Sequence, residues 1–377
     1  MREMEPRVRK KRVAWLIKGL GPGGAEHLLA ATAKEIDRSR FSIDVYYLLT
    51  HKDHLAPAFH ELGIPTICLD VRDERDVRWV FELRRALAEK HFAIVHAHSP
   101  YAASFARVAA RTLPREQRPR FVTTEHNPWT TFKPMTRFVN AATSPLNDAT
   151  IAVSEEARAS MSPRMQRRCE TLTHGIDIAS ARSLRAARDD VRKELGFTDD
   201  EFVVGTIANY HTKKDWPNLL RAARRAHSRN DRLRFCAVGQ GPLENAVKAL
   251  HAELDLHDVV VLPGYRPDAV RLMAGCDAFV LASRWEGLPV ALMEACALSL
   301  PIIATAVGGI PDVFTSGQDA LLVPPNDDEV LADAINTVAT NPALRASLSR
   351  GSACLARSFD VTRAVQRIEQ IYDELAP

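Results

Sequence analysis

Residues 282–312 read A-S-R-W-E-G-L-P-V-A-L-M-E-A-C-A-L-S-L-P-I-I-A-T-A-V-G-G-I-P-D, and this stretch decides the fold. The short apolar run just before it, residues 277–282, predicts a buried strand. A polar turn at residues 283–288 follows, and Pro289 suits the first position of a helix that we expect to run to residue 299. A strand, a turn and a helix in this order form the repeating unit of an α/β protein.

Two carboxylates stand out in this stretch. The helix expected at residues 289–299 is apolar nearly all round and should be buried, yet it carries Glu294, and a buried charge is costly without a partner. Glu286 lies eight residues earlier, which at about 1.5 Å per residue places the two roughly 12 Å apart. Between them lies a helix N-terminus, whose free N–H groups and positive dipole favour a phosphate. A nucleotide-sugar, with hydroxyls at both ends and a diphosphate in the middle, fits this layout.

The pattern E-x7-E, headed by E-G-L-P and followed by V-G-G-I-P-D, resembles the donor site of family 4 retaining glycosyltransferases, which have the GT-B fold. The resemblance implies that Glu286 contacts the transferred sugar and that Glu294 holds the ribose hydroxyls. It also implies that Gly287, Leu288 and Pro289 form the helix start that faces the diphosphate. The alternative for Glu294 is a helix residue satisfied by neighbouring backbone or by a cation.

Composition limits the class of protein. A chain of 377 residues favours two domains, and a hydrophobic fraction of 46% with a charged fraction of 26% is typical of a soluble globular protein. No apolar run approaches the roughly 20 residues that span a bilayer. The six cysteines are scattered without a C-x-x-C pair, which favours free thiols in a reducing compartment. We therefore expect a cytoplasmic protein.

The charge of the chain argues against a nucleic-acid partner, because a net charge of +3 is small for this length. Two local basic clusters occur, R-V-R-K-K-R at residues 7–12 and R-M-Q-R-R at residues 164–168. They are either solvated surface or contacts with anionic lipid, whose attraction is roughly 1 kcal/mol per basic residue at a membrane surface. The second interpretation places the protein at the inner face of the membrane.

The chain begins with a strand expected at residues 13–18, a glycine loop at residues 19–24 and a helix at residues 25–37. The loop matches G-x-G-x-x-G, but a dinucleotide site needs an acidic residue at the end of the second strand, and residues 42–49 are followed by Thr50, His51 and Lys52. The nicotinamide interpretation is therefore disfavoured. The resemblance implies instead that Gly23 and Gly24 approach the donor across an interdomain cleft, where a side chain would occupy the ligand's space.

Further strands are expected at residues 66–69, 94–97, 121–124 and 151–153, with helices at residues 75–90 and 102–111 between them. This alternation predicts a parallel sheet that binds ligands at the carboxyl ends of its strands. His96, His98 and His126 occupy that edge. The resemblance implies that His126 lies next to the donor sugar and acceptor, and the alternative for all three is a hydrogen-bonded loop histidine. A metal pair lacks supporting Cys or carboxylate spacing.

Residues 129–140, W-T-T-F-K-P-M-T-R-F-V-N, mix aromatic, methionine and basic residues. An ordinary packed segment is one interpretation of this composition. The other is an acceptor surface or a membrane contact, because the resemblance implies that the N-terminal domain recognises an acceptor that is often a lipid-linked saccharide.

The second domain restarts with a strand at residues 202–208 and the segment N-Y-H-T-K-K-D-W at residues 209–216. This segment resembles the family's G-R-L-x-x-x-K-G, in which an arginine and a lysine clamp the diphosphate. Lys214 matches the lysine, whereas Asn209 stands at the arginine position and carries no charge. Either Lys213 or another base compensates, or the donor is held more weakly. Tyr265 and Arg266 fall in the family's base-binding loop, where backbone groups usually read the base.

The resemblance implies a GT-B architecture of two Rossmann-like, doubly wound α/β domains that face a cleft. We expect an acceptor-side domain at residues 1–178, a linker at residues 179–198 and a nucleotide-sugar-binding domain at residues 199–358. Residues 359–377 are expected to pack back on the first domain through a C-terminal helix at residues 361–375.

The predicted activity is transfer of a hexosyl unit from a nucleotide-diphosphate-α-sugar to an acceptor hydroxyl with retention, in cell-envelope polysaccharide or glycolipid synthesis. The acceptor is expected to be a saccharide or a lipid-linked saccharide. No carboxylate suits a nucleophile on the far face of the donor, so the resemblance implies a front-face mechanism in which the departing phosphate helps to deprotonate the acceptor. Glu286, His126 and Lys214 are the catalytic candidates. We expect no metal and no cofactor, since no D-x-D stands in a plausible loop.

Two other functions remain open at this point. One is a nucleotide-sugar epimerase of the same fold, although such enzymes lack this E-x7-E context. The other is a non-catalytic subunit for glycan binding or assembly, which the presence of Glu286, Glu294 and Lys214 disfavours.

Overall fold

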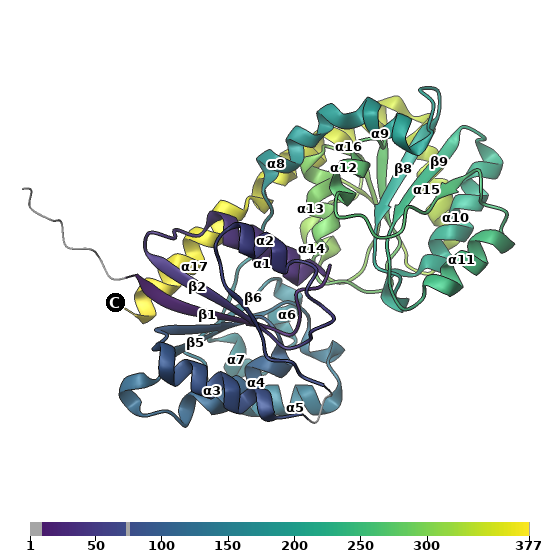
Figure 1. The fold of residues 1–377 in the computed structure, drawn as a ribbon. Helices are drawn as coiled ribbons and strands as arrows, with labels where there is room; N and C mark the ends of the chain where they lie inside the picture. The colour runs from purple at the N-terminus through teal and green to yellow at the C-terminus, as the bar shows by residue number, and fades with distance from the viewer. Residues whose placement is uncertain (1–9, 73–75, 377) are drawn as a thin grey trace, which may run out of the picture. The chain divides into compact units, whose positions relative to one another are not determined.

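A computed structural model describes residues 10–72 and 76–376 (Figure 1). The chain divides into two compact units, one of Met1–Gly175 with Val361–Pro377 and the other of Ile176–Asp360. Each unit is a parallel β-sheet covered by helices, which confirms the expected fold class of two Rossmann-like α/β domains. Of the basic cluster at residues 7–12, residues 7–9 lie outside the described residues. Within the described ranges, no helix has both the length and the apolar character needed to span a membrane.

The first unit contains a seven-stranded sheet in the order β3-β2-β1-β4-β5-β6-β7. Neighbouring strands are all parallel. The strands are β1 (Lys11–Ile17), β2 (Phe41–Tyr47), β3 (Thr66–Cys68), β4 (Ile94–Ala97), β5 (Arg120–Glu125), β6 (Ala149–Ala152) and β7 (Cys169–Thr171). Alternate residues of β1 enter different cores, with Val13, Trp15 and Ile17 on one face and Ala14 and Leu16 on the other. Both faces of this sheet are therefore buried, as is usual for parallel strands.

The helices of the first unit cover both faces of its sheet (Figure 1). They are α1 (Gly24–Glu35), α2 (Ala56–Glu61), α3 (Arg78–Lys90), α4 (Pro100–Arg111), α5 (Pro134–Thr143), α6 (Glu155–Ala159), α7 (Pro163–Gln166) and α17 (Val361–Leu375). Three short 3-10 helices accompany them, η1 (Arg115–Gln117), η2 (Trp129–Thr131) and η3 (Ser144–Leu146). Helices α1 and α17 share one core, whereas α3 and α4 pack in the other.

Helix α17 belongs to the first unit although it ends the chain. Its residues Val365, Ile368 and Tyr372 are buried in the core that also contains α1. The Tyr372 hydroxyl lies 3.0 Å from Nε1 of Trp15 and 2.6 Å from Nδ1 of His96, so it joins two strands of the sheet. The expectation that a C-terminal helix crosses back to the first domain is confirmed.

The second unit contains a six-stranded sheet in the order β10-β9-β8-β11-β12-β13. Its strands are β8 (Phe202–Ile207), β9 (Leu233–Val238), β10 (Val260–Val261), β11 (Ala278–Leu281), β12 (Ile302–Thr305) and β13 (Leu321–Val323). Its helices are α8 (Ile178–Ser183), α9 (Arg188–Leu195), α10 (Trp216–Arg229), α11 (Glu244–Glu253), α12 (Ala269–Met273), α13 (Val290–Ala297), α14 (Ile310–Val313), α15 (Asp328–Thr340) and α16 (Pro342–Leu355). The 3-10 helices are η4 (Leu184–Ala187), η5 (Thr212–Lys214) and η6 (Ala356–Phe359).

The strand order reverses once in each sheet. The reversal falls between β1 and β4 in the first unit and between β8 and β11 in the second. Ligands of doubly wound sheets bind outside the carboxyl ends of the strands at such a point, because the connections on its two sides leave in opposite directions. The loops after β1, β4, β8 and β11 are therefore the first places in which to look for a site.

The expectation of a linker at residues 179–198 is wrong, because this segment is part of the second unit as α8, η4 and α9. Arg192 of α9 is buried, and its guanidinium lies 3.1 Å from the carboxylate of Asp277. The same carboxylate accepts a 2.8 Å hydrogen bond from the backbone N–H of Val203. The charged composition that predicted a linker instead forms a buried polar contact at the amino ends of β8 and β11.

The helix expected at residues 289–299 is shorter at both ends. Pro289 is the N-cap in an extended conformation and not the first helical residue, and α13 runs from Val290 to Ala297. At the other end Ser299 has a φ of 58°, a left-handed conformation that cannot continue a helix. The estimate of the separation between Glu286 and Glu294 from helical rise therefore applies only from Val290 onward.

Substitution of Ile368 by alanine tests the contribution of α17 to the first unit. Ile368 is 1% exposed, so Ile368→Ala should lower the free energy of unfolding by about 2–5 kcal/mol through lost burial and the cavity left behind. Chemical denaturation followed by tryptophan fluorescence measures this loss. The control Arg363→Ala, at an exposed position of the same helix, should change stability little, and equal stability of both variants would contradict the packing of α17.

Candidate functional site

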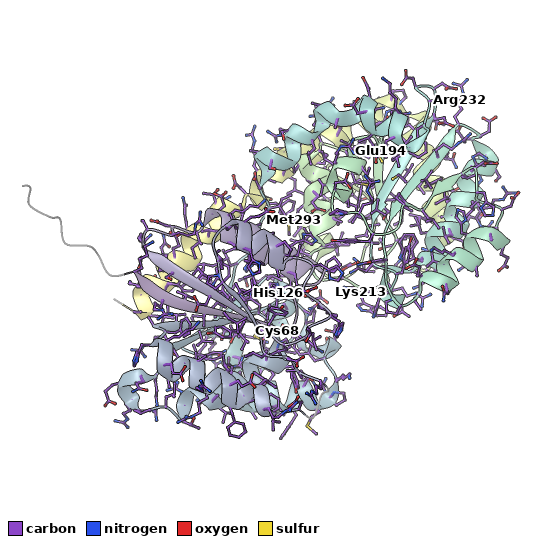
Figure 2. The ribbon with its side chains drawn as sticks, viewed as in Figure 1. Cys68, His126, Glu194, Lys213, Arg232 and Met293 are labelled. Atoms are coloured by element: carbon purple, nitrogen blue, oxygen red, sulfur yellow. The ribbon has the colours of Figure 1, made fainter. Side chains whose placement is uncertain are left out.

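A buried ion pair lies at the reversal point of the second sheet. The ammonium group of Lys214, in the loop after β8, contacts Oε1 of Glu286, in the loop after β11, and the two side chains are 11% and 4% exposed. The hydroxyl of Ser283 donates a 2.6 Å hydrogen bond to the same oxygen. Lys213 (labelled in Figure 2) brings a second ammonium group to 3.9 Å from Oε2 of Glu286. The two loops thus meet through charged side chains at the edge where a ligand is expected.

Burial and charge act against each other at Lys214. Desolvation lowers the pKa of the Lys214 ammonium, while the adjacent Glu286 carboxylate favours its charged form. Removing either partner would leave an unpaired charge in a buried position, which is strongly destabilising. A ligand that carries negative charge can compete with Glu286 for Lys214, so this pair suits a site for an anionic group.

Backbone contacts hold the loops after β8 and β11 together. The backbone N–H of Arg284 donates to the carbonyl of Lys213 at 2.8 Å, and the Arg284 guanidinium lies 2.9 Å from a carboxylate oxygen of Asp215. Asp215 is 1% exposed and has a φ of 46°, so the turn between η5 and α10 is tight as well as buried. These contacts hold the loop that carries Lys213 and Lys214 against the loop after β11.

The loop after β12 is tied to the same place. The Thr305 hydroxyl donates a 2.6 Å hydrogen bond to the carbonyl of Ser283, and the Gly309 N–H donates to the carbonyl of Gly287 at 3.1 Å. Gly308 has a φ of 57°, which places this turn in the left-handed region that glycine adopts readily. The glycine turn at Gly308 and Gly309 therefore contacts the turn that precedes α13.

The start of α13 is exposed on its loop side. Gly287 and Leu288 are partly exposed, whereas Pro289 and the first helical residue Val290 are buried. The first N–H groups of a helix have no partner within the helix, and they concentrate positive potential at this end. Gly287, Leu288 and Pro289 thus place a helix N-terminus directly after Glu286.

Glu294 lies in the second turn of α13 and is partly buried. Its carboxylate has no hydrogen bond or ion pair with any residue in the described part of the chain. Burial raises the pKa of Glu294 to about 7. A carboxyl group that stays half protonated near neutral pH and lacks a protein partner is suited to bind ligand hydroxyls, because it can both donate and accept hydrogen bonds.

The other expected donor-binding residues occupy loops of the second unit. Asn209 is exposed, and its carbonyl accepts a 3.0 Å hydrogen bond from Nε1 of Trp216. Tyr265 is 38% exposed. The guanidinium of Arg266 is held by the carboxylates of Glu194 at 2.7 Å and Asp268 at 2.8 Å. The Arg266 side chain is thus engaged within the protein, whereas the Tyr265 side chain of the same loop is exposed.

Gly23 and Gly24 lie in the first unit at the start of α1, where Gly23 is the N-cap and Gly24 the first helical residue. A Cβ atom on Gly23 would collide with the carboxylate of Glu26. That carboxylate is the end of a flexible side chain that can move aside, so this contact alone does not require glycine at position 23.

Four histidines form an array at the carboxyl edge of the first sheet. His96 lies in β4 and His98 directly after it, His126 directly follows β5, and His174 lies in the loop after β7. The ring centroids of successive members are 4.2, 5.7 and 5.6 Å apart, and Nδ1 of His98 lies 3.4 Å from Nε2 of His126 (labelled in Figure 2). His126 thus lies between two other imidazole rings.

The first member of this array is a structural residue. His96 is 1% exposed, and its two ring nitrogens contact the hydroxyls of Tyr372 at 2.6 Å and Thr124 at 2.8 Å. This matches the alternative of a hydrogen-bonded histidine. In contrast, Nε2 of His98 and Nε2 of His174 are buried without a hydrogen-bond partner among the described residues.

Burial lowers the pKa of all four imidazoles, that of His174 to about 4, and positive charge on neighbouring rings would lower those of His96, His98 and His126 further. The array is therefore neutral at pH 7. Because the unfolded chain binds protons more readily than these rings, acidification below about 6.5 favours unfolding of the first unit.

Two residues that contact the candidate site residues, Ser283 and His174, were not predicted from the sequence. Ser283 donates a hydrogen bond to Glu286 from three positions upstream. Both residues lie in the loop before α13, whose N-cap is Pro289, so they do not form a capping box that the sequence could have shown. His174 lies beside His126 in the structure but follows it by 48 positions in the chain. No local signal connects those two histidines.

The raised pKa of Glu294 predicts a pH-dependent stability. The folded protein holds a proton on Glu294 up to about pH 7, whereas an unfolded glutamate loses it near pH 4.3, so stability falls as the pH rises through about 5 to 8. Glu294→Gln removes this loss. The melting temperature of Glu294→Gln minus that of the parent protein should therefore increase as the pH rises from about 5 to 8. A difference that stays constant over this range would contradict a raised pKa of Glu294. Glu253→Gln, at an exposed position of α11, controls for the removal of a charge.

Comparison with known proteins agrees with this geometry. The family model "Glycosyl transferases group 1" matches residues 187–353, and the model "Glycosyltransferase Family 4" matches residues 22–180. A putative glycosyltransferase of Bacillus subtilis, EpsF, is 28% identical over 325 residues, which is 82% of each chain. The UDP-Gal:alpha-D-GlcNAc-diphosphoundecaprenol alpha-1,3-galactosyltransferase of Escherichia coli is 24% identical over 342 residues, which is 86% of each chain.

A solved structure shows the same fold. The crystal structure of Anabaena HepE in complex with UDP and glucose superposes with a TM-score of 0.83 over 96% of this chain and 99% of that one, at 21% identity. The two family models together account for both units, and the matching curated relatives quoted above carry glycosyltransferase names. The chain belongs to the family 4 type of group 1 glycosyltransferases and is an enzyme of that class.

Proposed function

We propose that the protein is a retaining hexosyltransferase that uses a nucleotide-diphosphate-α-sugar as donor. The observation that carries this proposal is the Lys214–Glu286 pair at the reversal point of the second sheet, directly before the N-terminus of α13. Two ammonium groups and a helix N-terminus are suited to a diphosphate, and a carboxylate beside them is suited to sugar hydroxyls. A nucleotide-sugar presents both chemistries in adjacent positions.

Departure of the nucleotide diphosphate is the charge-developing step in this proposal. When the anomeric C–O bond breaks, negative charge grows on the β-phosphate, and Lys214, Lys213 and the N–H groups at the start of α13 stabilise it. Lys213 supplies the second positive charge that Asn209 lacks. The departing phosphate then accepts the proton of the acceptor hydroxyl, which attacks from the same face, so the configuration is retained.

The sugar and ribose ends of the donor are assigned to the two carboxylates. Glu286 contacts the transferred sugar, and its bond with Ser283 fixes the direction of its oxygens. Glu294 holds the ribose hydroxyls, which supplies the hydrogen-bond partners that its carboxyl group lacks within the described residues. Backbone groups near Tyr265 and Arg266 contact the base.

Residues of the first unit are assigned to the sugar and the acceptor. Because His126 is neutral, it can accept or donate a hydrogen bond with a hydroxyl. The Gly23 N–H is engaged with the carbonyl of Gly21, so we propose that Gly23 and Gly24 act through their lack of a side chain, which leaves room for the donor. We propose transfer without a metal ion or other cofactor, because Lys213, Lys214 and a helix N-terminus supply the positive charge that a diphosphate requires.

The relatives suggest the kind of acceptor. The Escherichia coli relative is named for a diphosphoundecaprenol-linked acceptor, and HepE was crystallised with UDP and glucose. By analogy we propose a UDP-sugar or related donor and a saccharide acceptor carried on a lipid, within cell-envelope polysaccharide or glycolipid synthesis. The enzyme would then work in the cytoplasm at the inner face of an anionic membrane, without a nucleic-acid partner.

A panel of UDP-, GDP- and ADP-sugars, incubated with the protein and acceptor extracts, tests the proposed function through the nucleotide released. Glu286→Gln and Lys214→Ala should each lower kcat/KM by about 100-fold or more, because they remove groups that contact the reacting sugar or the leaving diphosphate. Glu294→Gln should mainly raise KM for the donor. Glu253→Gln, which changes an exposed carboxylate, should leave both constants unchanged.

Three results would contradict the proposal. If no donor is consumed and none raises the melting temperature, a non-catalytic subunit is favoured, because a ligand of the native state stabilises it. If the donor sugar isomerises without transfer, the protein is an epimerase. If Glu286→Gln and Lys214→Ala retain full activity, the site has been placed wrongly.

A further inference from the structure

A cavity lies at the edge of the second sheet that is opposite the candidate donor site. It has a volume of about 500 Å³, and its lining includes Asp277 and Pro301, which directly precede β11 and β12. The cavity is therefore at the amino ends of these strands, whereas Lys214 and Glu286 lie beyond the carboxyl ends of β8 and β11. All the residues that line it belong to the second unit. Its volume is within the range of small-molecule sites, about 300–1,000 Å³.

The charged side chains around this cavity are mainly basic. Three guanidinium groups line it, and they belong to Arg185 in η4, Arg188 in α9 and Arg345 in α16. Among the lining residues in the described part of the chain, Asp277 is the only one with a carboxylate. That carboxylate is shared, since it lies 2.6 Å from the guanidinium of Arg188 and 3.1 Å from that of the buried Arg192. The wall of the cavity thus has an excess of positive charge, which favours an anionic ligand.

Two of the three guanidinium groups have N–H groups left for a ligand. Nη1 of Arg185 donates a 3.3 Å hydrogen bond to the hydroxyl of Ser299. Nη1 of Arg345 donates to the carbonyls of Val338 at 3.2 Å and Ala339 at 2.9 Å. Within residues 10–72 and 76–376, neither arginine has a carboxylate within ion-pair distance. The contacts through Nη1 hold both side chains, while Nε and Nη2 of each remain able to donate a pair of parallel hydrogen bonds.

The helix ends around the cavity do not reverse this charge. Pro342 lines it in the first turn of α16, where the helix dipole is positive. Leu298 and Ser299 line it just after the last residue of α13, where the dipole is negative. Each helix end is equivalent to about half an elementary charge, so the two oppose each other. The full charges of the arginines therefore determine the sign of the potential in the cavity.

A second cavity, of about 390 Å³, adjoins the first, because Asp277 and Arg345 line both. Its lining includes the carboxylates of Asp199 and Asp200 and the guanidinium of Arg232, which is labelled in Figure 2. Carboxylates accept hydrogen bonds from hydroxyl groups. A ligand whose anionic group occupies the first cavity can therefore extend a hydroxyl-bearing part toward the second.

We propose that the first cavity binds the phosphate group of a small phosphorylated metabolite of the sugar-phosphate class. Arg185 and Arg345 donate hydrogen bonds to the phosphate oxygens from two different elements. Arg188 stays paired with Asp277 and adds positive charge. Guanidinium groups suit this ligand because their planar, bidentate geometry matches that of phosphate oxygens. The site is separate from the candidate donor site, and the proposal does not depend on the proposed function.

Isothermal titration calorimetry of the full-length protein at constant ionic strength tests this proposal. The parent protein should bind inorganic phosphate and glucose 6-phosphate, whereas glucose, which lacks a phosphate, should not bind. Arg185→Glu should weaken binding of both anions by roughly tenfold or more, because a carboxylate replaces a phosphate-binding guanidinium. Arg345→Gln should weaken it as well. Arg182→Glu makes the same charge change at an exposed position of α8 that does not line the cavity, and it should leave binding unchanged.

The variant Lys213→Ala distinguishes this cavity from the candidate donor site, where Lys213 lies. Unchanged binding of glucose 6-phosphate by Lys213→Ala, together with weaker binding by Arg185→Glu, supports the proposal. Weaker binding by Lys213→Ala with full binding by Arg185→Glu places the anion at the donor site and overturns it. Absence of binding of both anions by the parent protein also overturns it, as does an equal loss in Arg182→Glu and Arg185→Glu.

Two further measurements separate binding in this cavity from folding and from catalysis. The melting temperature of each variant shows whether it is folded, and Arg185→Ala removes the guanidinium without adding a negative charge if Arg185→Glu is unstable. Full binding of both anions by a folded Arg185→Ala and by Arg345→Gln overturns the proposal. Release of nucleotide from a donor sugar tests the proposed function separately, because Arg185 lies outside the candidate donor site.

Discussion

The buried contact between Lys214 and Glu286 is the interaction on which the candidate site depends. It joins the loops after β8 and β11, the two strands at which the order of the second sheet reverses. Desolvation of two charges is expensive, so such a pair adds little net stability compared with apolar residues of similar size. A charged pair at the ligand edge of the sheet is therefore better explained by a charged ligand than by a contribution to stability. Ser283 donates a hydrogen bond to Glu286, and Thr305 and Gly309 donate hydrogen bonds to the carbonyls of Ser283 and Gly287 on either side of it.

The first unit differs from the second in that its ligand edge carries neutral side chains instead of charged ones. Its carboxyl edge carries four imidazoles that burial keeps neutral, and Tyr372 of α17 holds the innermost of them. The last helix of the chain therefore contributes to the order of this array as well as to the core. Neutral rings of this kind suit hydroxyl groups of a sugar or an acceptor, whereas the second unit concentrates the positive charge that a diphosphate needs.

Much of the fold followed from the sequence because it rests on local patterns. Alternating apolar runs and glycine turns predicted the α/β class, and the helix expected at residues 361–375 is α17. The linker was predicted wrongly, since no local signal shows that Arg192 pairs with a carboxylate 85 positions later. The position of His174 beside His126 was not predicted for the same reason, since the two residues are 48 positions apart in the chain. The roles of Glu294, Asn209 and His126 came from resemblance and stay predictions.

The stereochemistry of transfer is the most direct test of the proposed retaining reaction, in which the acceptor attacks from the face that the diphosphate leaves. Proton NMR of the product, recorded before the anomeric centre can equilibrate, distinguishes an α-linkage from a β-linkage through the coupling constant of the anomeric proton. With an α-linked nucleotide-sugar as donor, a retaining enzyme gives an α-linked product. A β-linked product would show inversion and would contradict the assignment of same-face attack beside Lys214 and Glu286.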